Sequence, residues 1–161
     1  MTAVASDVYV APGARLIGDV RLASESSVFH GTVLRGEAAP IEVGSQTNVQ
    51  DNCVVEATPG HPVGIGARVS LGHNARVYGA IIEERSLIAI GATVLAGARI
   101  GTNSIVAANA TVPENMQVPP RSLVIGQGRI LRAVTQAEIE RIEHGADEYV
   151  RLGRDYLRTS A

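Results

Sequence analysis

The chain has 161 residues, a formal net charge of −2 and only 3% aromatic residues. This length suits a single domain over 1–161, and the charge balance argues against nucleic acid or a membrane as a partner. The scarcity of aromatic rings argues against base stacking. No apolar run approaches the roughly 18 residues that a membrane helix needs, and the N-terminal stretch lacks the features of a signal peptide. We therefore expect a cytoplasmic protein.

Residues 8–122 comprise the predicted coils and an exit loop. The coils are organised by a six-residue repeat, ending near Val112, that begins with Val, Ile or Leu and has a small residue four positions later. Examples are LIGDVR (16–21), VGSQTN (43–48), VLAGAR (94–99) and VAANAT (106–111). A helix period of 3.6 and plain strand alternation fit this pattern less well. Three such blocks form one triangular coil of about 18 residues, and coils stack at the strand spacing. The repeat predicts an all-β fold, a left-handed parallel β-helix.

The C-terminal stretch 135–157 predicts an α-helix after a proline-rich exit from the last coil. Thr135 and Glu138 have the spacing of a capping box. Apolar residues lie on one stripe of this segment, which is typical of a helix that packs on its own coil or on a neighbour. Gly145 weakens the middle of the helix by about 1 kcal/mol relative to Ala. We expect this helix to be structural.

The repeat also predicts which side chains stack, because three blocks return the chain to the same face. The second positions of three stacked blocks form one outward column, Arg35, Glu56 and Tyr78, topped by Leu95. The third positions of three other blocks form a second column, Asp51, His73 and Ile90.

A three-sided prism with outward columns most simply closes as a homotrimer, in which one column meets the other column of a neighbouring subunit. Gln50 and Asn52 would lie nearby. Such a polar cluster is either a network that serves assembly or a pocket for a small-molecule substrate. The density of titratable side chains on a few coils favours the pocket.

Three segments carry a family likeness: RGE (35–37), NVQDN (48–52) and LGHNA (71–75). Over roughly residues 8–150 the chain resembles the γ-class carbonic anhydrases. The resemblance implies a left-handed β-helix homotrimer with a zinc ion at each subunit interface. Three histidines hold that zinc in the family, two from one subunit and one from its neighbour.

In the resemblance, the middle zinc ligand falls on His73, and the other two fall on Glu56 and Tyr78. The family's arginine falls on Arg35 and its nearby acid, usually aspartate, on Glu37. The family's glutamine and aspartate fall on a further pair, Gln50 and Asp51.

Catalytic zinc typically has three protein ligands and one open position, and a neutral phenol is a poor ligand. We therefore expect no metal, no other cofactor, and weak or absent zinc-dependent hydration of carbon dioxide. His61, on a loop, is the one histidine that could reach the site, although a loop histidine before proline is usually exposed. His30 and His144 are expected to lie elsewhere.

Without metal, the same residues predict acid–base chemistry by Glu56, His73 and Tyr78 on a small carbonyl or carboxylate compound. The reaction classes are lyase, cyclase, isomerase or hydrolase. The residues expected to bind the substrate are Arg35, Glu37, Gln50, Asp51 and Asn52.

Three alternatives stay open: a non-catalytic assembly or binding subunit, a CoA-dependent acyltransferase, and a metalloenzyme with Glu, His and Tyr ligands. Cys53 occupies an inward fifth position, so we expect it in the core, where it is not a nucleophile.

Overall fold

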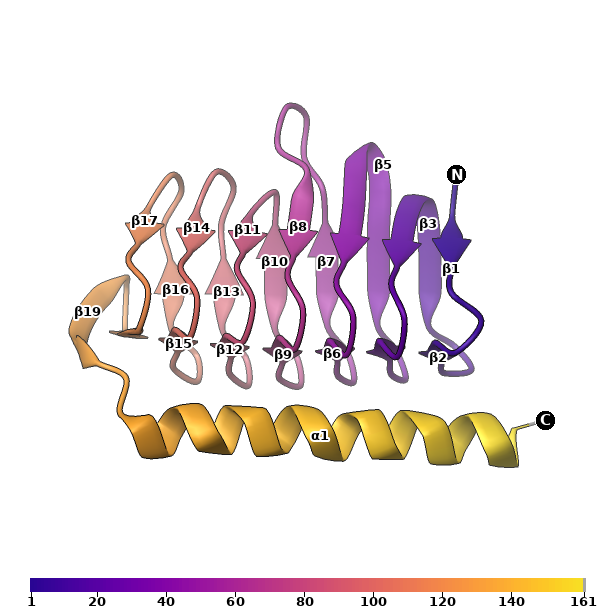
Figure 1. Ribbon diagram of the computed structural model, residues 1–161. Helices are drawn as coiled ribbons and strands as arrows, with labels where there is room; N and C mark the ends of the chain where they lie inside the picture. Colours follow the sequence, from indigo (N-terminus) through magenta and orange to yellow (C-terminus); the bar gives the residue numbers. More distant parts are fainter. Residues whose placement is uncertain (161) are drawn as a thin grey trace.

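Short parallel strands wind into a left-handed β-helix of about seven coils, with one α-helix along its side (Figure 1). This structure is a computed structural model and describes residues 1–160. It confirms the fold that the six-residue repeat predicts. The helix α1 spans Gln136–Thr159, close to the predicted 135–157.

Two sheets form the three faces of the prism. The eight-stranded sheet forms the face that α1 covers, called here the helix face. Its strands are β2 (Tyr9–Val10), β4 (Ser27–Val28), β6 (Asn48–Val49), β9 (Ser70–Leu71), β12 (Leu87–Ile88), β15 (Ile105–Val106), β18 (Ser122–Ile125) and β19 (Arg129–Ala133). All of its neighbouring pairs are parallel except β18 with β19, which is antiparallel.

The eleven-stranded sheet forms the other two faces, because β3 (Arg15–Leu22) and β5 (Val33–Val43) are long enough to bend around a corner. The first halves of β3 and β5 belong to a face called here the β7 face, where β5 pairs with β7. It contains β7 (Val54–Glu56), β10 (Arg76–Tyr78), β13 (Thr93–Val94) and β16 (Thr111–Val112). The third face contains β1 (Ala3–Val4), β8 (Val63–Ile65), β11 (Ile81–Ile82), β14 (Arg99–Ile100) and β17 (Gln117–Val118).

The first residue of each repeat fills the core, as the sequence predicts. On the β7 face these residues pair in register from coil to coil. None of their side chains is exposed to solvent, and the members of this column are Leu34, Val55, Val77, Val94 and Val112. Because the inward positions are filled by aliphatic side chains, the second and third positions point outward.

The corner between the helix face and the β7 face is turned by residues in the left-handed conformation. Asn52 and Asn74 both have φ of 61° there, a conformation that asparagine tolerates better than most residues. The backbone N–H of Asn52 donates to the carbonyl of His30, and that of Asn74 to the carbonyl of Asp51, at 2.9 and 3.0 Å. These bonds hold successive coils of this corner in a fixed register.

The helix α1 begins at the predicted capping box, in which the Thr135 hydroxyl accepts from the Glu138 N–H and the Glu138 carboxylate accepts from the Thr135 N–H. Two apolar clusters hold the helix against the coils. One contains Ile105, Val134 and Ile142 near its start, and the other contains Tyr9, Phe29 and Tyr156 near its end. Arg68, at a corner, adds ion pairs to Glu143 and Asp147, each at 2.8 Å.

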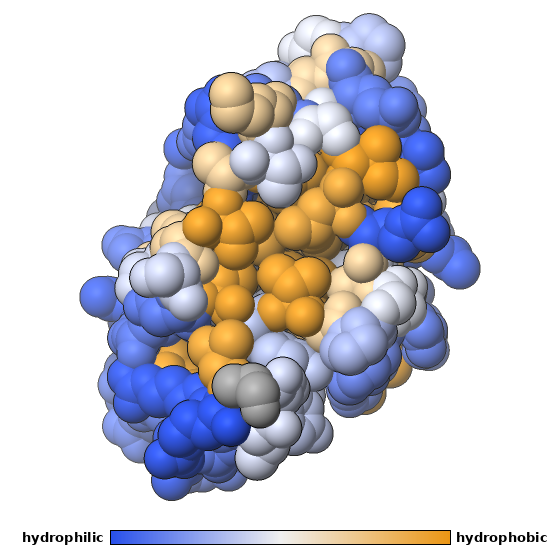
Figure 2. Space-filling model, turned by 90° about the vertical axis from the view of Figure 1, so that its right-hand side faces the viewer, coloured by the Kyte–Doolittle hydropathy of each residue, from blue (hydrophilic) through white to orange (hydrophobic). Residues whose placement is uncertain are grey.

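The coil that contains β1 lies at one end of the β-helix. Figure 2 shows apolar side chains gathered on this end of the molecule, and Val4 in β1 is 43% exposed. Over residues 1–160, the structure contains no helix whose length and apolarity would carry it across a bilayer.

Candidate acid–base site

The first outward column lies on the β7 face as the sequence predicts. Arg35 in β5 pairs in register with Glu56 in β7, which pairs with Tyr78 in β10. All three residues are partly buried. The Arg35 guanidinium lies 3.4 Å from the carboxylate of Glu37, which is exposed further along the same strand. This column therefore places a cation, a carboxylate and a phenol in a row on the outside of the β7 face.

The second column lies at the corner before the same face and contains His30, Asp51 and His73. The two Asp51 oxygens face one imidazole each: Nδ1 of His30 at 3.6 Å and Nδ1 of His73 at 3.6 Å. The expectation that His30 lies elsewhere is wrong. Its block begins at Val28, and β4 pairs directly with β6, so His30 occupies the third position below Asp51.

The arrangement of this column suits proton transfer. A carboxylate that faces Nδ1 of an imidazole orients the ring and leaves Nε2 for a substrate. The side chains of Asp51 and His73 are 41% and 44% exposed, so a substrate can reach them.

Tyr149 of α1 joins the surroundings of this column and was not predicted from the sequence. Its ring packs edge-on against Phe29 at 5.3 Å between centroids. Burial raises the pKa of the Tyr149 phenol, and the negative charge of Asp51 raises it further. Tyr149 is thus a neutral hydrogen-bond donor in this region at ordinary pH.

The two columns stand at opposite ends of the β7 face within one chain. His73 precedes the corner residue Asn74, and Tyr78 ends β10, five positions further along the chain. Asp51 and Glu56 have the same separation in sequence. A single chain therefore does not bring the two columns together.

Gln50 and Asn52 were both expected near the site. In the structure, each makes contacts that the fold itself requires. Gln50 is buried beneath α1, where its amide donates to Asn48 at 3.0 Å and Asn48 donates to Ser70 at 2.8 Å. Asn52 turns the corner, and its Oδ1 lies over Gly31, where a Cβ would approach it to 2.2 Å. The fold itself accounts for an amide at both positions.

The donor set does not fit the zinc site that the resemblance implies. Besides His73, the other two positions of the implied ligand set hold a carboxylate, Glu56, and a phenol, Tyr78. Because a neutral phenol is a poor zinc ligand, three good ligands are not available.

Of the remaining histidines, His61 lies next to Gly79, the residue after Tyr78, and His144 lies on α1. His61 is on the loop between β7 and β8, where its backbone pairs with Thr58, and its exposed side chain borders a hollow with Gly97 and Arg99. His144 is exposed on α1, 3.1 Å from Glu148. The expectation for His144 is confirmed.

Cys53 is fully buried, as predicted, and its Sγ lies 3.1 Å from the carbonyl oxygen of Gly72. Burial raises the pKa of this thiol to about 12. A protonated, inaccessible thiol is not a nucleophile.

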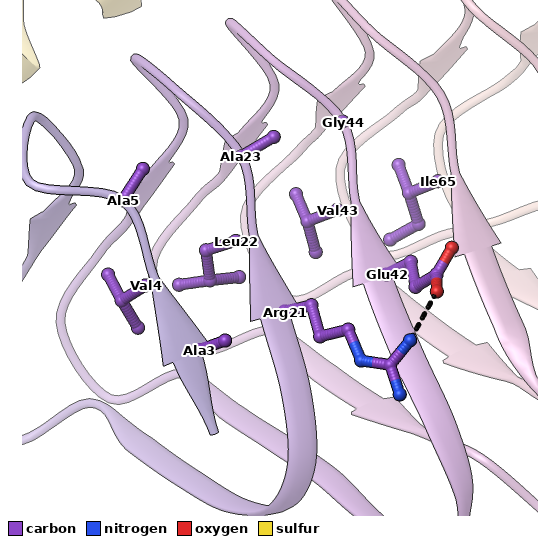
Figure 3. A pocket seen from close by; sticks show the side chains of 10 residues that line it. All are labelled: Ala3, Val4, Ala5, Arg21, Leu22, Ala23, Glu42, Val43, Gly44 and Ile65. Atoms are coloured by element: carbon purple, nitrogen blue, oxygen red, sulfur yellow. Dashed lines mark hydrogen bonds and ion pairs between the residues drawn. The ribbon is translucent and has the colours of Figure 1, made fainter. Parts of the chain in front are cut away.

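A larger hollow, of about 530 Å³, lies on the N-terminal coils of the third face (Figure 3). Its polar part is one ion pair, Arg21 with Glu42 at 2.9 Å. The residues behind it, Leu22, Val43 and Ile65, belong to the core. None of the candidate site residues lines this hollow, so we do not assign it the chemistry of the columns.

Comparison with known proteins places the chain in a family. Residues 79–114 match the family model described as bacterial transferase hexapeptide (six repeats). A "probable carbonic anhydrase" of Methanocaldococcus jannaschii is 44% identical over 150 residues, which are 92% of this chain and 94% of that protein. A carbonic anhydrase of Geobacillus kaustophilus is 38% identical over 154 residues, 95% of this chain and 85% of that protein.

A mitochondrial γ carbonic anhydrase of Arabidopsis thaliana is 36% identical over 165 residues, 98% of this chain and 60% of that protein. Among solved structures, a hexapeptide transferase family protein from Anaplasma phagocytophilum matches with a TM-score of 0.92 and 32% identity. That match covers 96% of this chain and 92% of the other. The chain therefore belongs to the γ-class carbonic anhydrase family of hexapeptide-repeat proteins.

Proposed function

We propose that the protein is a homotrimeric enzyme that performs metal-independent acid–base chemistry on a small carbonyl or carboxylate compound. One observation carries the proposal: Asp51 faces His73 and His30, each at 3.6 Å, at an accessible corner of the fold. In the proposed trimer this column faces Arg35, Glu56 and Tyr78 of the neighbouring subunit.

Each side chain then has a role that its chemistry allows. His73 takes or returns a proton through Nε2, and Asp51 positions its ring. Tyr78 donates a hydrogen bond to an oxygen that gains negative charge, and Arg35 binds a carboxylate. Glu56, beside Tyr78, is the second acid–base group. Glu37 positions Arg35 from 3.4 Å.

The test is proton exchange at the carbon next to a carbonyl group, followed by proton NMR in D₂O with pyruvate and acetoacetate as probes. We expect the wild-type protein to accelerate exchange, and His73→Ala and Glu56→Ala to abolish it. Ile90→Ala is the matched control, because Ile90 is the next residue in the His73 column and is 53% exposed. Exchange that is no faster than in buffer, or that survives His73→Ala, contradicts the proposal.

The trimer is tested separately by sedimentation of the 16.8 kDa chain. We expect the mass of three chains for the wild-type protein and for both catalytic variants. A monomer would leave the two columns apart and would contradict the proposed site. A trimer without exchange activity would instead favour a non-catalytic assembly subunit.

A second candidate is acyl transfer, which the transferase named among the solved relatives favours. This function predicts that CoA raises the melting temperature by binding the folded state. No stabilisation by millimolar CoA would exclude it. Zinc-dependent carbon dioxide hydration, the activity in the names of two relatives, would require tightly held zinc, which elemental analysis of the purified protein measures.

A further inference from the structure

A cavity of about 330 Å³ lies between α1 and the helix face, apart from the two columns. Its volume falls within the range of small-molecule sites, about 300–1,000 Å³. The residues that line it come from the coils and from one side of α1: Gln50, Ser70, Leu87, Ile105, Glu138, Arg141, Ile142, Gly145 and Tyr149.

The cavity lies beside the buried stripe of α1, at Gly145, which has no side chain to fill it. The two apolar clusters that hold the helix lie on either side of this residue in sequence, one around Ile142 and the other around Tyr149. A Cβ built on Gly145 meets no atom within 4 Å. Close packing therefore does not require glycine here, although glycine weakens a helix interior. The absent side chain leaves space over the coils.

The floor of the cavity changes from polar to apolar along one column of the helix face. Asn48, Ser70, Leu87 and Ile105 are in register on β6, β9, β12 and β15. The Ser70 hydroxyl accepts from Asn48, but its own O–H has no acceptor among the described residues. Gln50 donates its amide to Asn48, and its carbonyl oxygen has no donor among these residues. One end of the floor therefore offers a free donor and a free acceptor.

The charge at the rim is positive. Arg141 is exposed at the cavity edge and makes no ion pair within residues 1–160. Glu138, its acidic neighbour on the lining, is already bound by Arg132 through two hydrogen bonds of 2.8 and 2.9 Å. Arg141 and Tyr149 are eight residues apart on α1, about 12 Å along the helix axis. An anionic group would therefore be favoured at the Arg141 end, away from Asp51.

We propose that the cavity at Gly145 binds a short aliphatic carboxylate that carries a hydroxyl or carbonyl group at its far end. The carboxylate pairs with Arg141, the chain lies on Leu87, Ile105 and Ile142, and the far polar group bonds to Ser70 and Gln50. This site does not depend on the trimer or on the proposed catalytic chemistry.

The experiment is a titration of the full chain by ¹H–¹⁵N NMR with 6-hydroxyhexanoate as the probe. Hexanoate lacks the far hydroxyl, and 1,6-hexanediol lacks the charge. We expect 6-hydroxyhexanoate to bind more tightly than either and to shift the amide signal of Gly145. Equal affinity for hexanediol, or no binding at millimolar concentration, would overturn the proposal.

Three variants make the test specific. Gly145→Leu fills the cavity, so we expect binding to be lost while the melting temperature is unchanged or higher. Arg141→Gln should weaken binding about tenfold, the usual effect of losing a charged hydrogen-bond partner. Arg151→Gln is the matched control, because Arg151 is an exposed arginine of α1 that does not line the cavity.

Each variant can also contradict the proposal. Binding that survives Gly145→Leu, or a large fall in melting temperature from that substitution, would mean that the cavity is not the site. Binding that falls in Arg35→Gln but not in Arg141→Gln would assign the carboxylate to the first column instead.

Discussion

Asp51 and His73 face each other on successive coils, with Oδ1 of the carboxylate 3.6 Å from Nδ1 of the imidazole. The backbone N–H groups of Asn74 and Asn52 donate to the carbonyls of Asp51 and His30 and hold the backbone of these coils in register. The relationship is thus set by the backbone of the β-helix and does not depend on a mobile loop.

The first prediction concerns this pair. Asp51→Asn keeps the size of the side chain but removes the charge that orients the His73 ring. We expect kcat for proton exchange to fall at least tenfold with little change in KM, since a positioned base contributes about 10²–10⁴-fold. His30→Gln is the comparison, because His30 faces the other Asp51 oxygen. An unchanged kcat in Asp51→Asn would remove Asp51 from the mechanism.

The second prediction concerns metal. Glu56 and Tyr78 pair in register, and we expect the wild-type protein to retain no stoichiometric zinc after purification without a tag. In the proposed trimer, the double variant Glu56→His, Tyr78→His places two imidazoles opposite His73 of the neighbouring subunit. This variant should bind about one zinc per chain. Elemental analysis measures both, with Tyr78→Phe as the control. Tightly held zinc in the wild-type protein would contradict this prediction and would make carbon dioxide hydration the first assay.

The third prediction compares two glycines. A Cβ at Gly44 would lie 2.5 Å from the backbone of Gly66 on the next coil, whereas a Cβ at Gly145 would touch nothing. Gly44→Ala should therefore lower the free energy of unfolding by about 1–3 kcal/mol. Gly145→Ala should raise it by up to about 1 kcal/mol. Urea unfolding measures both, and equal effects would mean that coil stacking tolerates a methyl group at Gly44.

The fourth prediction concerns acid. The Arg132 guanidinium, helped by the Thr135 backbone N–H, lowers the pKa of Glu138 from 4.5 to about 2. A carboxyl group whose pKa is lower in the folded state stabilises that state fully above its ordinary pKa. This contribution is lost as the pH falls from about 4.5 towards 2. The helix signal in circular dichroism should decline over this range.

Glu138→Gln supplies the comparison, because a glutamine cannot titrate. Above about pH 4.5, the circular dichroism helix signal of this variant should be lower than that of the wild-type protein. Its decline in acid should lack the contribution that comes from protonation of Glu138. Identical acid curves for the two proteins would show that the capping box does not hold the start of α1.

The fifth prediction concerns Cys53. Its pKa of about 12 and its complete burial predict that iodoacetamide does not label the native protein at pH 8. Labelling should begin at the urea concentration that unfolds the chain. Rapid labelling of the native protein would place the thiol at the surface.

Much of this arrangement is readable from the sequence because the repeat has a fixed length. Once blocks of six residues are aligned, Arg35, Glu56 and Tyr78 must stack, and the registers of β5, β7 and β10 confirm it. The same rule places His30 below Asp51, one coil earlier than the predicted column began. The block that begins at Val28 carries this signal in the sequence.

The features that the sequence does not reveal depend on how α1 docks. The position of Tyr149 and the cavity at Gly145 are set by the packing of one helix across many coils, which has no fixed period. Gln50 illustrates the difference. Its block position is outward, as expected, but α1 covers that face, so the side chain is buried.

The path of α1 has a consequence for synthesis on the ribosome. The helix runs back along the β-helix, so that Arg154 pairs with Glu25 and the ring of Tyr156 lies 5.1 Å from that of Tyr9. The coils of Tyr9 and Glu25 are therefore made before the part of α1 that covers them. Until Tyr149 and Tyr156 have been made, the aromatic rings of Tyr9 and Phe29 remain open to other nascent chains and to chaperones.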